Sequence, residues 1–295
     1  MLAVAMIFSI IPAVKAEAAQ THKMTLYVGE TLEESIYGTT VKSVKSSKKS
    51  VVSGKKSSTL RFKAEMEAKK AGKATVTVKT TGGTYKFDIT VKKLKCDFDI
   101  QLLPSGAVML KTTNNTNTVF DTVAVRYTLK NVNGETIESD TAHVRAVIPG
   151  QTAYTQISSL STAKREGFDA ASSTVEVIGD ERNLSYTYKY SPDSLKVTNK
   201  TASQTSESQV SVDFKYKNTS SKDLNGQVIF LFYDDNGELI DMSNKGIYLS
   251  GKDADSSIVN SYGGWRTYDE NYQPVLTNFG SLKIVKNVYT LTRKK

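Results

Sequence analysis

The feature of this sequence that most constrains its fold is a strand–turn–strand pattern that occurs twice. Residues 226–241 read GQVIFLFYDDNGELID, an apolar-rich run followed by Asn236-Gly237 and a second strand-like run. Residues 123–137 read VAVRYTLKNVNGETI, and their Asn133-Gly134 lies 103 positions before Asn236-Gly237. An Asn-Gly pair favours positive φ at both central positions of a type I′ turn, whose twist suits two antiparallel strands. Each pattern therefore predicts a β-hairpin.

A second pair of motifs has the same spacing, because Asn115-Thr116 lies 103 positions before Asn218-Thr219. A constant offset over two motifs indicates a duplicated domain. The length of 295 residues allows two or three domains, and the repeat favours three modules, over residues 20–93, 94–190 and 191–295. Each repeat holds six or seven short alternating strands in about 95 residues, which is typical of a β-sandwich. The sequence therefore predicts an all-β rod of three sandwiches, with short linkers near 93–96 and 190–193.

Residues 1–19 are expected to be a signal peptide rather than part of the fold. The apolar run over 2–14 is too short to span a bilayer, and Val14-Lys15-Ala16 is a small-residue cleavage pattern. A buried N-terminal strand or helix is the alternative, and the missing basic n-region leaves open whether the true start lies upstream. We expect a secreted, extracellular protein with no transmembrane span in the mature chain.

Cys96 is the only cysteine, so no disulfide can cross-link a domain. We expect it to be a small buried residue near a module boundary. An exported β protein without disulfides suggests a Gram-positive surface protein or exoprotein. The sequence has no Leu-Pro-x-Thr-Gly sorting motif and no C-terminal apolar anchor, so any attachment to the cell wall is expected to be non-covalent.

The first module carries a recognisable order of short motifs. It opens with LYVGETL at 26–32, continues through a Ser-rich stretch at 42–52, and ends in AGKATV at 71–76 before a Gly82-Gly83 hairpin. This order resembles the bacterial immunoglobulin-like group 2 domain, although Val44 stands near the place of that family's usual central Trp. The resemblance implies a small β-sandwich over residues 20–93.

The repeated modules suggest a second resemblance. The run FLFYD at 230–234, followed by Asp235-Asn236-Gly237, is similar to the motif that names the FxLYD family, with Phe232 in place of its Leu. Members are extracytoplasmic immunoglobulin-like or fibronectin-like sandwiches in which an Asn-Thr turn precedes the central hairpin. The second module keeps only part of the motif, because residues 125–129 lack the Tyr-Asp pair. Together the resemblances imply three tandem immunoglobulin-like β-sandwich domains and an extracytoplasmic address, but no activity.

Positive charge is concentrated in the first module. Residues 20–95 contain 17 Lys and Arg against 6 Asp and Glu, a net charge of +11, whereas residues 96–295 carry a net charge of −2. Such a field attracts anionic polymers, and wall teichoic acid or anionic lipid headgroups suit a secreted protein. No aromatic residue between Tyr37 and Phe62 could stack on bases, which disfavours specific nucleic-acid binding. The alternative is a solvated face that serves solubility. The candidate polyanion contacts are Lys42, Lys45, Lys48, Lys49, Lys55 and Lys56.

The sequence offers little for catalysis. His22 and His143 are the only histidines and lie in different modules, and no zinc, redox or nucleophile-elbow motif occurs. The acidic run around Asn236-Gly237 does not keep the spacing of a calcium loop, so a turn is the better interpretation. We expect no catalytic residue, no cofactor and no metal site.

The connection over residues 260–279 departs from the sandwich pattern. It contains the only Trp of the chain, beside Gly263-Gly264, and several tyrosines with polar neighbours. Rings flanked by polar groups suit binding of a sugar or a protein. The alternative is a loop that folds over the sandwich and packs its aromatics as a small additional core. The candidate ligand-binding residues are Trp265, Arg266, Tyr268 and Tyr272.

These observations predict a non-catalytic secreted or cell-surface protein that binds a polysaccharide, a wall polymer or a host protein. A purely structural spacer, or an accessory part of a larger extracellular complex, is the alternative. Exposure of Trp265 would favour the first hypothesis, and burial the second.

Overall fold

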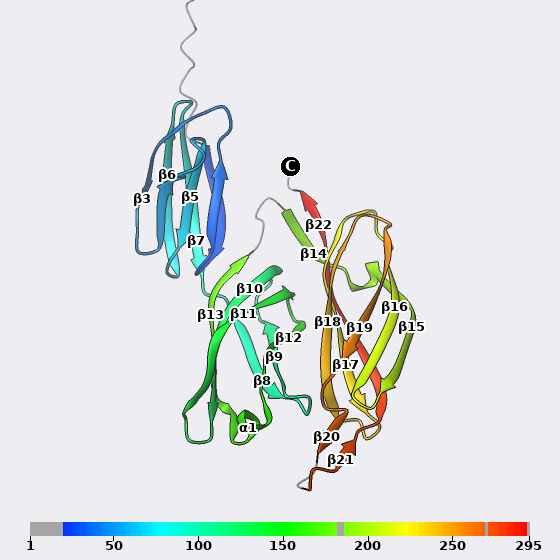
Figure 1. Ribbon diagram of the computed structural model, residues 1–295. Helices are drawn as coiled ribbons and strands as arrows, with labels where there is room; N and C mark the ends of the chain where they lie inside the picture. The colour runs from blue at the N-terminus through cyan, green and yellow to red at the C-terminus, as the bar shows by residue number, and fades with distance from the viewer. Residues whose placement is uncertain (1–19, 182–185, 269–270, 294–295) are drawn as a thin grey trace, which may run out of the picture. The chain divides into compact units, whose positions relative to one another are not determined.

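The computed structural model describes residues 20–181, 186–268 and 271–293 (Figure 1). Within these residues the chain forms 22 strands, one four-residue α-helix and one three-residue 3-10 helix, which confirms the all-β expectation. The predicted signal peptide, residues 1–19, lies outside the described residues. The chain divides into two compact units, and the division falls between Lys93 and Leu94. We call them unit 1 and unit 2 and describe each by itself.

Unit 1 contains two sheets. The first has the order β1 (Gln20–Tyr27), β7 (Thr84–Lys92), β6 (Gly72–Thr80), β3 (Val41–Ser46), with β1 parallel to β7. The second has the order β2 (Thr31–Ser35), β5 (Lys63–Ala68), β4 (Val52–Lys56). Alternation along β6 and β7 buries one face of each strand, with Val76, Val78 and Phe87 at most 2% exposed. The predicted hairpin between them is present, because the N–H of Thr80 donates to the carbonyl of Gly83 at 2.9 Å.

Unit 2 consists of two halves. The first half has the sheets β11-β10-β13 and β12-β9-β8. Its strands are β8 (Cys96–Leu102), β9 (Ala107–Asn114), β10 (Phe120–Asn131), β11 (Thr136–Val147), β12 (Thr152–Ser159) and β13 (Phe168–Glu181), with helix α1 (Thr162–Arg165) before β13. The second half has the sheets β14-β22-β17-β18, β15-β16-β19 and β20-β21. Its elements are β14 (Tyr186–Tyr190), η1 (Pro192–Ser194), β15 (Leu195–Ser206), β16 (Gln209–Asn218), β17 (Leu224–Asp234), β18 (Leu239–Leu249), β19 (Ala254–Ser261), β20 (Arg266–Tyr268), β21 (Pro274–Leu276) and β22 (Phe279–Arg293).

The two halves repeat one topology. The order β11-β10-β13 corresponds to β18-β17-β22, and β12-β9-β8 corresponds to β19-β16-β15. The predicted hairpins are the pairs β10–β11 and β17–β18, and each has a register shift at the same place, between Leu129 and Lys130 and between Phe232 and Tyr233. The shifts lie 103 positions apart, as the sequence motifs do. The repeat read from the sequence is therefore present as matched hairpins with matched bulges.

The turns of these hairpins are not of type I′. Among the described residues, positive φ in the two turns is confined to Gly134, at +79°, and Gly237, at +84°. Each hairpin closes with a three-residue loop that ends in a left-handed glycine, the arrangement that accompanies a bulge. The last residue of the strand before each loop stabilises it, because Oδ1 of Asn131 accepts the N–H of Glu135 and Oδ1 of Asp234 accepts the N–H of Glu238. The expectation of positive φ at both Asn and Gly was wrong for this reason.

The two Asn-Thr motifs of the sequence are not structurally equivalent residue for residue, because the matching positions are shifted by one residue. The equivalent positions are Asn114 and Asn218, both completely buried, each with Oδ1 accepting the N–H of the residue two positions later. Their amide nitrogens donate to carbonyls across the sheet edge, Asn114 to Val147 at 2.9 Å and Asn218 to Ser250 at 3.0 Å. The structural offset here is 104, because Asn114 and not Asn115 makes these bonds. In each half a buried asparagine therefore stabilises the turn at this position.

The halves of unit 2 pack directly on each other. Strand β14 follows the first half in sequence but pairs with β22 of the second, so Tyr188 and Tyr289 are neighbours in one sheet, with ring centroids 5.3 Å apart. Tyr188 and Tyr289 therefore do not lie on matching strands of two separate sandwiches. A shared apolar cluster also includes Met109 of the first half and Leu231 of the second. The two halves therefore belong to one compact unit, residues 94–295.

Candidate functional site

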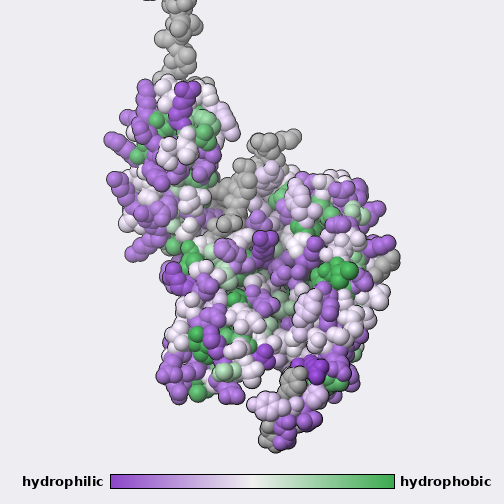
Figure 2. Space-filling model, viewed as in Figure 1, coloured by the Kyte–Doolittle hydropathy of each residue, from purple (hydrophilic) through white to green (hydrophobic). Residues whose placement is uncertain are grey.

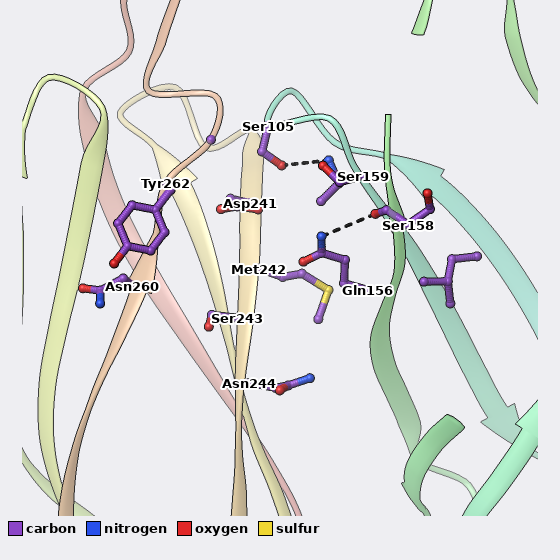
Figure 3. Close-up of a pocket in the computed structure, with 13 residues that line it drawn as sticks. Ser105, Gln156, Ser158, Ser159, Asp241, Met242, Ser243, Asn244, Asn260 and Tyr262 are labelled. Atoms are coloured by element: carbon purple, nitrogen blue, oxygen red, sulfur yellow. Dashed lines mark hydrogen bonds between the residues drawn. The ribbon is translucent and has the colours of Figure 1, made fainter. Parts of the chain in front are cut away.

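A polar groove of about 740 Å³ lies between the two halves of unit 2. Figure 3 shows Asn260 and Tyr262 on one side, Gln156 and Ser158 on the other, and Asp241, Ser243 and Asn244 between them. The side chains come from β19, β12 and β18, and each of these is the outer strand of its sheet. The polar lining residues are Ser105, Gln156, Ser158, Ser159, Asp241, Ser243, Asn244, Asn260 and Tyr262.

One end of the groove is formed by the turn between β8 and β9. The guanidinium of Arg165 in α1 donates to the carbonyls of Pro104 at 3.0 Å and Ser105 at 2.8 Å, which holds this turn in place. The N–H of Ser105 donates to the carbonyl of Ile240 at 3.2 Å. This bond joins the two halves next to the groove.

The β12 wall contains an irregularity beside the groove. The register of β12 against β9 shifts between Gln156 and Ser158. Oη of Tyr127 donates to the carbonyl of Ile157 at 2.9 Å and also lies 2.8 Å from Oε1 of Glu138. Burial, and then the hydrogen bond to Glu138, raises the pKa of Tyr127, so its hydroxyl stays protonated and holds the shifted segment.

The β19 wall presents an amide and a ring. Oδ1 of Asn260 accepts from Nε2 of Gln209 at 3.1 Å and from Oγ of Ser211 at 2.8 Å. These two donors fix the orientation of the amide. Tyr262 is 66% exposed, so a face of its ring is accessible to a ligand.

A chain of hydrogen bonds connects the groove to the core of the second half. Nε1 of Trp265 donates to Oγ of Ser261 at 2.7 Å, and Oγ of Ser261 donates to Oδ2 of Asp241 at 2.5 Å. All three residues are buried, and Asp241 also lines the groove. Indole N–H can only donate, so the serine must accept from it and direct its own proton to the carboxylate. Asp241 is thereby held as an acceptor at the centre of the groove.

The groove combines one carboxylate, several hydroxyls and amides, and one accessible ring. A hydroxyl-rich ligand can donate to the carboxylate, exchange hydrogen bonds with the amides and stack on the ring. The volume falls within the usual range for ligand sites, about 300–1,000 Å³. The arrangement therefore suits recognition of a saccharide rather than a covalent step.

Trp265, the residue expected to stack on a ligand, is completely buried. Its ring packs edge-on against Phe232 and Phe279, with centroids 6.5 and 6.0 Å away. Gly264, at φ +81°, lets the chain pass so close to β18 that a Cβ there would lie 2.6 Å from Cγ2 of Ile240. The glycine thus serves close packing, and the ring points inward. Trp265 is a packing residue and does not contact a ligand in this conformation.

Arg266 and Tyr272, which were proposed together with Trp265, are both exposed. Arg266, in β20, forms an ion pair with Glu207, and its Nη1 lies 2.9 Å from Oε2. Tyr272 is 84% exposed, with φ +57°, in the connection between β20 and β21. The backbone of Tyr268 pairs with Pro274, and its side chain lies outside the described part of the chain. Neither Arg266 nor Tyr272 lines the groove.

The candidate polyanion contacts in unit 1 come together along one edge. Strands β3 and β4 are the outer strands of the two sheets, and all six lysines are exposed on them or on their connection. Figure 2 shows hydrophilic side chains gathered over the side of unit 1 where Figure 1 labels β3. Lys55 also pairs with Glu65 at 3.0 Å. We call this surface the basic edge: Lys42, Lys45, Lys48, Lys49, Lys55 and Lys56.

The residues considered for chemistry are dispersed. His22 stacks on Phe87 at 5.4 Å in unit 1, and His143 is exposed in β11 of unit 2. Cys96 is only partly buried, at the start of β8. Over the described ranges, no group of three or more His, Cys, Asp or Glu is placed to hold a metal ion. In the same part of the chain, no helix has the length and apolar character needed to cross a bilayer.

Sequence reasoning missed the main residues of the groove. The sequence singles out neither Asp241, in the acidic run around Asn236-Gly237, nor Tyr262, one of several tyrosines in the connection over 260–279. Gln156, Asp241 and Asn260 are far apart in sequence, and only packing of the two halves brings them together.

A scan against models of known protein families and a search of curated proteins each gave no match to this chain.

Proposed function

We propose that this chain is a non-catalytic secreted or cell-surface protein that binds a polysaccharide in the groove between β12, β18 and β19. The observation that carries the proposal is the buried carboxylate of Asp241 beside the oriented amide of Asn260 and the exposed ring of Tyr262. These groups match the donors and faces of a sugar.

The basic edge supports a second contact, with an anionic polymer of the cell envelope. Exposed lysines on two neighbouring outer strands create a positive field that reaches about 8 Å at physiological salt. Lysines on outer strands also discourage edge-to-edge aggregation, which is the alternative role. Attachment through both surfaces would be non-covalent. The resemblance to immunoglobulin-like group 2 and FxLYD domains agrees with an extracytoplasmic, Gram-positive setting.

The groove is tested with a glycan and wall-polymer array, using the wild-type chain and the variant Tyr262→Ala. Loss of the stacked ring should weaken saccharide binding by roughly 0.5–1.5 kcal/mol beyond the loss of contact area, or about two- to twelvefold. Tyr272→Ala is the matched control, because Tyr272 is also exposed, at 84% against 66% for Tyr262, but lies outside the groove. An array without a saccharide, or equal losses in both variants, would contradict the proposal. A blank array favours the structural spacer, and binding of a protein alone favours a host-protein receptor.

The basic edge is tested by reversing Lys42, Lys45, Lys48 and Lys49 to Glu. Binding to isolated anionic walls should fall, and about 0.5 M salt should have the same effect on the wild-type chain, because exposed charges are screened. The control reverses Lys23, Lys86, Lys92 and Lys93, which changes the net charge equally but acts on or beyond β1 and β7. If both sets release the protein equally, net charge and not the basic edge is responsible.

A further inference from the structure

Asp241 is the one charged side chain among the described residues that line the groove, and it is 7% exposed. A carboxylate at this depth requires hydrogen bonds in place of water. Ser261 supplies one, to Oδ2 at 2.5 Å. A carboxylate offers about four acceptor positions, so most of the acceptor capacity of Asp241 is left for a ligand in the groove that it lines.

No lysine or arginine is among the described residues that line the groove. The guanidinium of Arg165, which holds the turn at the end of the groove, donates to the carbonyls of Leu160, Pro104 and Ser105. The remaining polar lining residues are neutral serines, asparagines, a glutamine and a tyrosine. A ligand that enters therefore meets one fixed negative charge with low exposure to solvent, where screening is weak.

We infer that Asp241 determines the specificity of the groove, which selects neutral or amino-bearing saccharides and rejects saccharides that carry carboxylate or phosphate groups. This inference rests on the proposed saccharide binding in the same groove. Hydroxyl and ammonium groups can donate to the carboxylate, whereas an anionic group can only repel it. Ser261 and Trp265 are positioning residues, because they orient the carboxylate without lining the groove.

A purely structural role is the competing explanation, in which Asp241 only anchors Ser261 and Trp265. That role predicts a loss of stability when the network is broken, but no change in discrimination between ligands by charge. Asp241→Asn separates the two explanations, because the amide oxygen can still accept from Ser261 while the charge is removed. A second variant, Asn244→Lys, adds a positive charge at an exposed lining position without touching the network.

The experiment titrates the full chain with three hexasaccharides, namely neutral cellohexaose, amino-bearing chitosan hexaose and acidic hexagalacturonate. All proteins carry the four-lysine reversal of the basic edge, so that acidic sugar does not bind there. The parent should bind the neutral and amino sugars at least about tenfold more tightly than the acidic one, because a poorly screened like charge is costly. Asp241→Asn should reduce the ratio of affinities, neutral or amino sugar over acidic sugar, to a few-fold. Asn244→Lys should also reduce this ratio.

Unchanged ratios in both variants would overturn the inference, even if saccharides bind. Failure of all three hexasaccharides to bind the parent would instead remove the proposed saccharide binding, and the inference with it. Emission of the single Trp provides a further readout. Saccharide binding should shift it in the parent, and Ser261→Ala should abolish the shift while binding persists, because the link from Asp241 to the indole is cut. A shift that survives in Ser261→Ala would exclude the positioning role.

Discussion

Trp265 shows how a single residue can connect the core of unit 2 to its surface. Its ring fills a space between Phe232 and Phe279, and its N–H reaches the groove through Ser261 and Asp241. A buried indole usually requires a partner for its N–H, and here the partner is part of the candidate binding site. The same side chain therefore contributes to stability by packing and to the site by orienting Asp241.

Replacing Trp265 by Ala should lower the free energy of unfolding by about 3–5 kcal/mol, the range for loss of a large core ring. Chemical denaturation followed by circular dichroism measures this without a Trp signal. Tyr272→Ala is the control and should change stability by less than about 0.5 kcal/mol, because the side chain is exposed. If Trp265→Ala were as harmless as the control, the ring would not be a core element.

The burial of Trp265 could not be read from its neighbours in sequence. Gly263-Gly264 and the polar residues that follow are equally typical of an exposed loop. What decides the orientation is contact with Phe232, 33 positions earlier in the chain, and such contacts leave no local pattern. The alternation that buries Val76, Val78 and Phe87 was predictable, because a strand alternates between faces with a period of two.

At the scale of elements, the two bulged hairpins are the best preserved part of the repeat. Their glycines take positive φ, and a Cβ placed on Gly134 or Gly237 would meet no atom within 4 Å. Backbone conformation alone therefore explains the need for glycine at these two positions. The Asn-Gly signal correctly predicted the hairpins and their spacing. The turn type differed, because Asn131 and Asp234 cap a three-residue loop that local propensity does not distinguish from a two-residue one.

Gly237→Val should lower the free energy of unfolding by roughly 1–3 kcal/mol, because it forces a β-branched residue into positive φ. The added side chain would not clash with any neighbour, so backbone strain alone would cause the loss. Asn236→Ala should cost less than about 0.5 kcal/mol, since Asn236 has an ordinary φ and an exposed side chain. Equal, large losses of unfolding free energy in the two variants would instead indicate a type I′ turn. Urea denaturation of both proteins provides the comparison.

At the scale of the whole molecule, the proposed function depends on how the halves of unit 2 meet. Strand β14 crosses from the first half to the sheet of the second, and Nδ2 of Asn287 donates to the carbonyl of Thr152 at 2.9 Å across the junction. The groove exists because these contacts set β12 beside β18. Sequence periodicity predicts each strand but not which outer strands will adjoin. The repeat was therefore predictable, whereas the site created between its two copies was not.

Hydrogen exchange measured by mass spectrometry, with and without the best-binding oligosaccharide from the array, tests the groove most directly. Bound saccharide should slow exchange in three separate segments, residues 156–159, 241–244 and 260–263, because they line one groove. Residues 42–56 of the basic edge and residues 271–276 around Tyr272 should exchange at unchanged rates. Protection confined to either of those regions, with the three groove segments unaffected, would contradict the account.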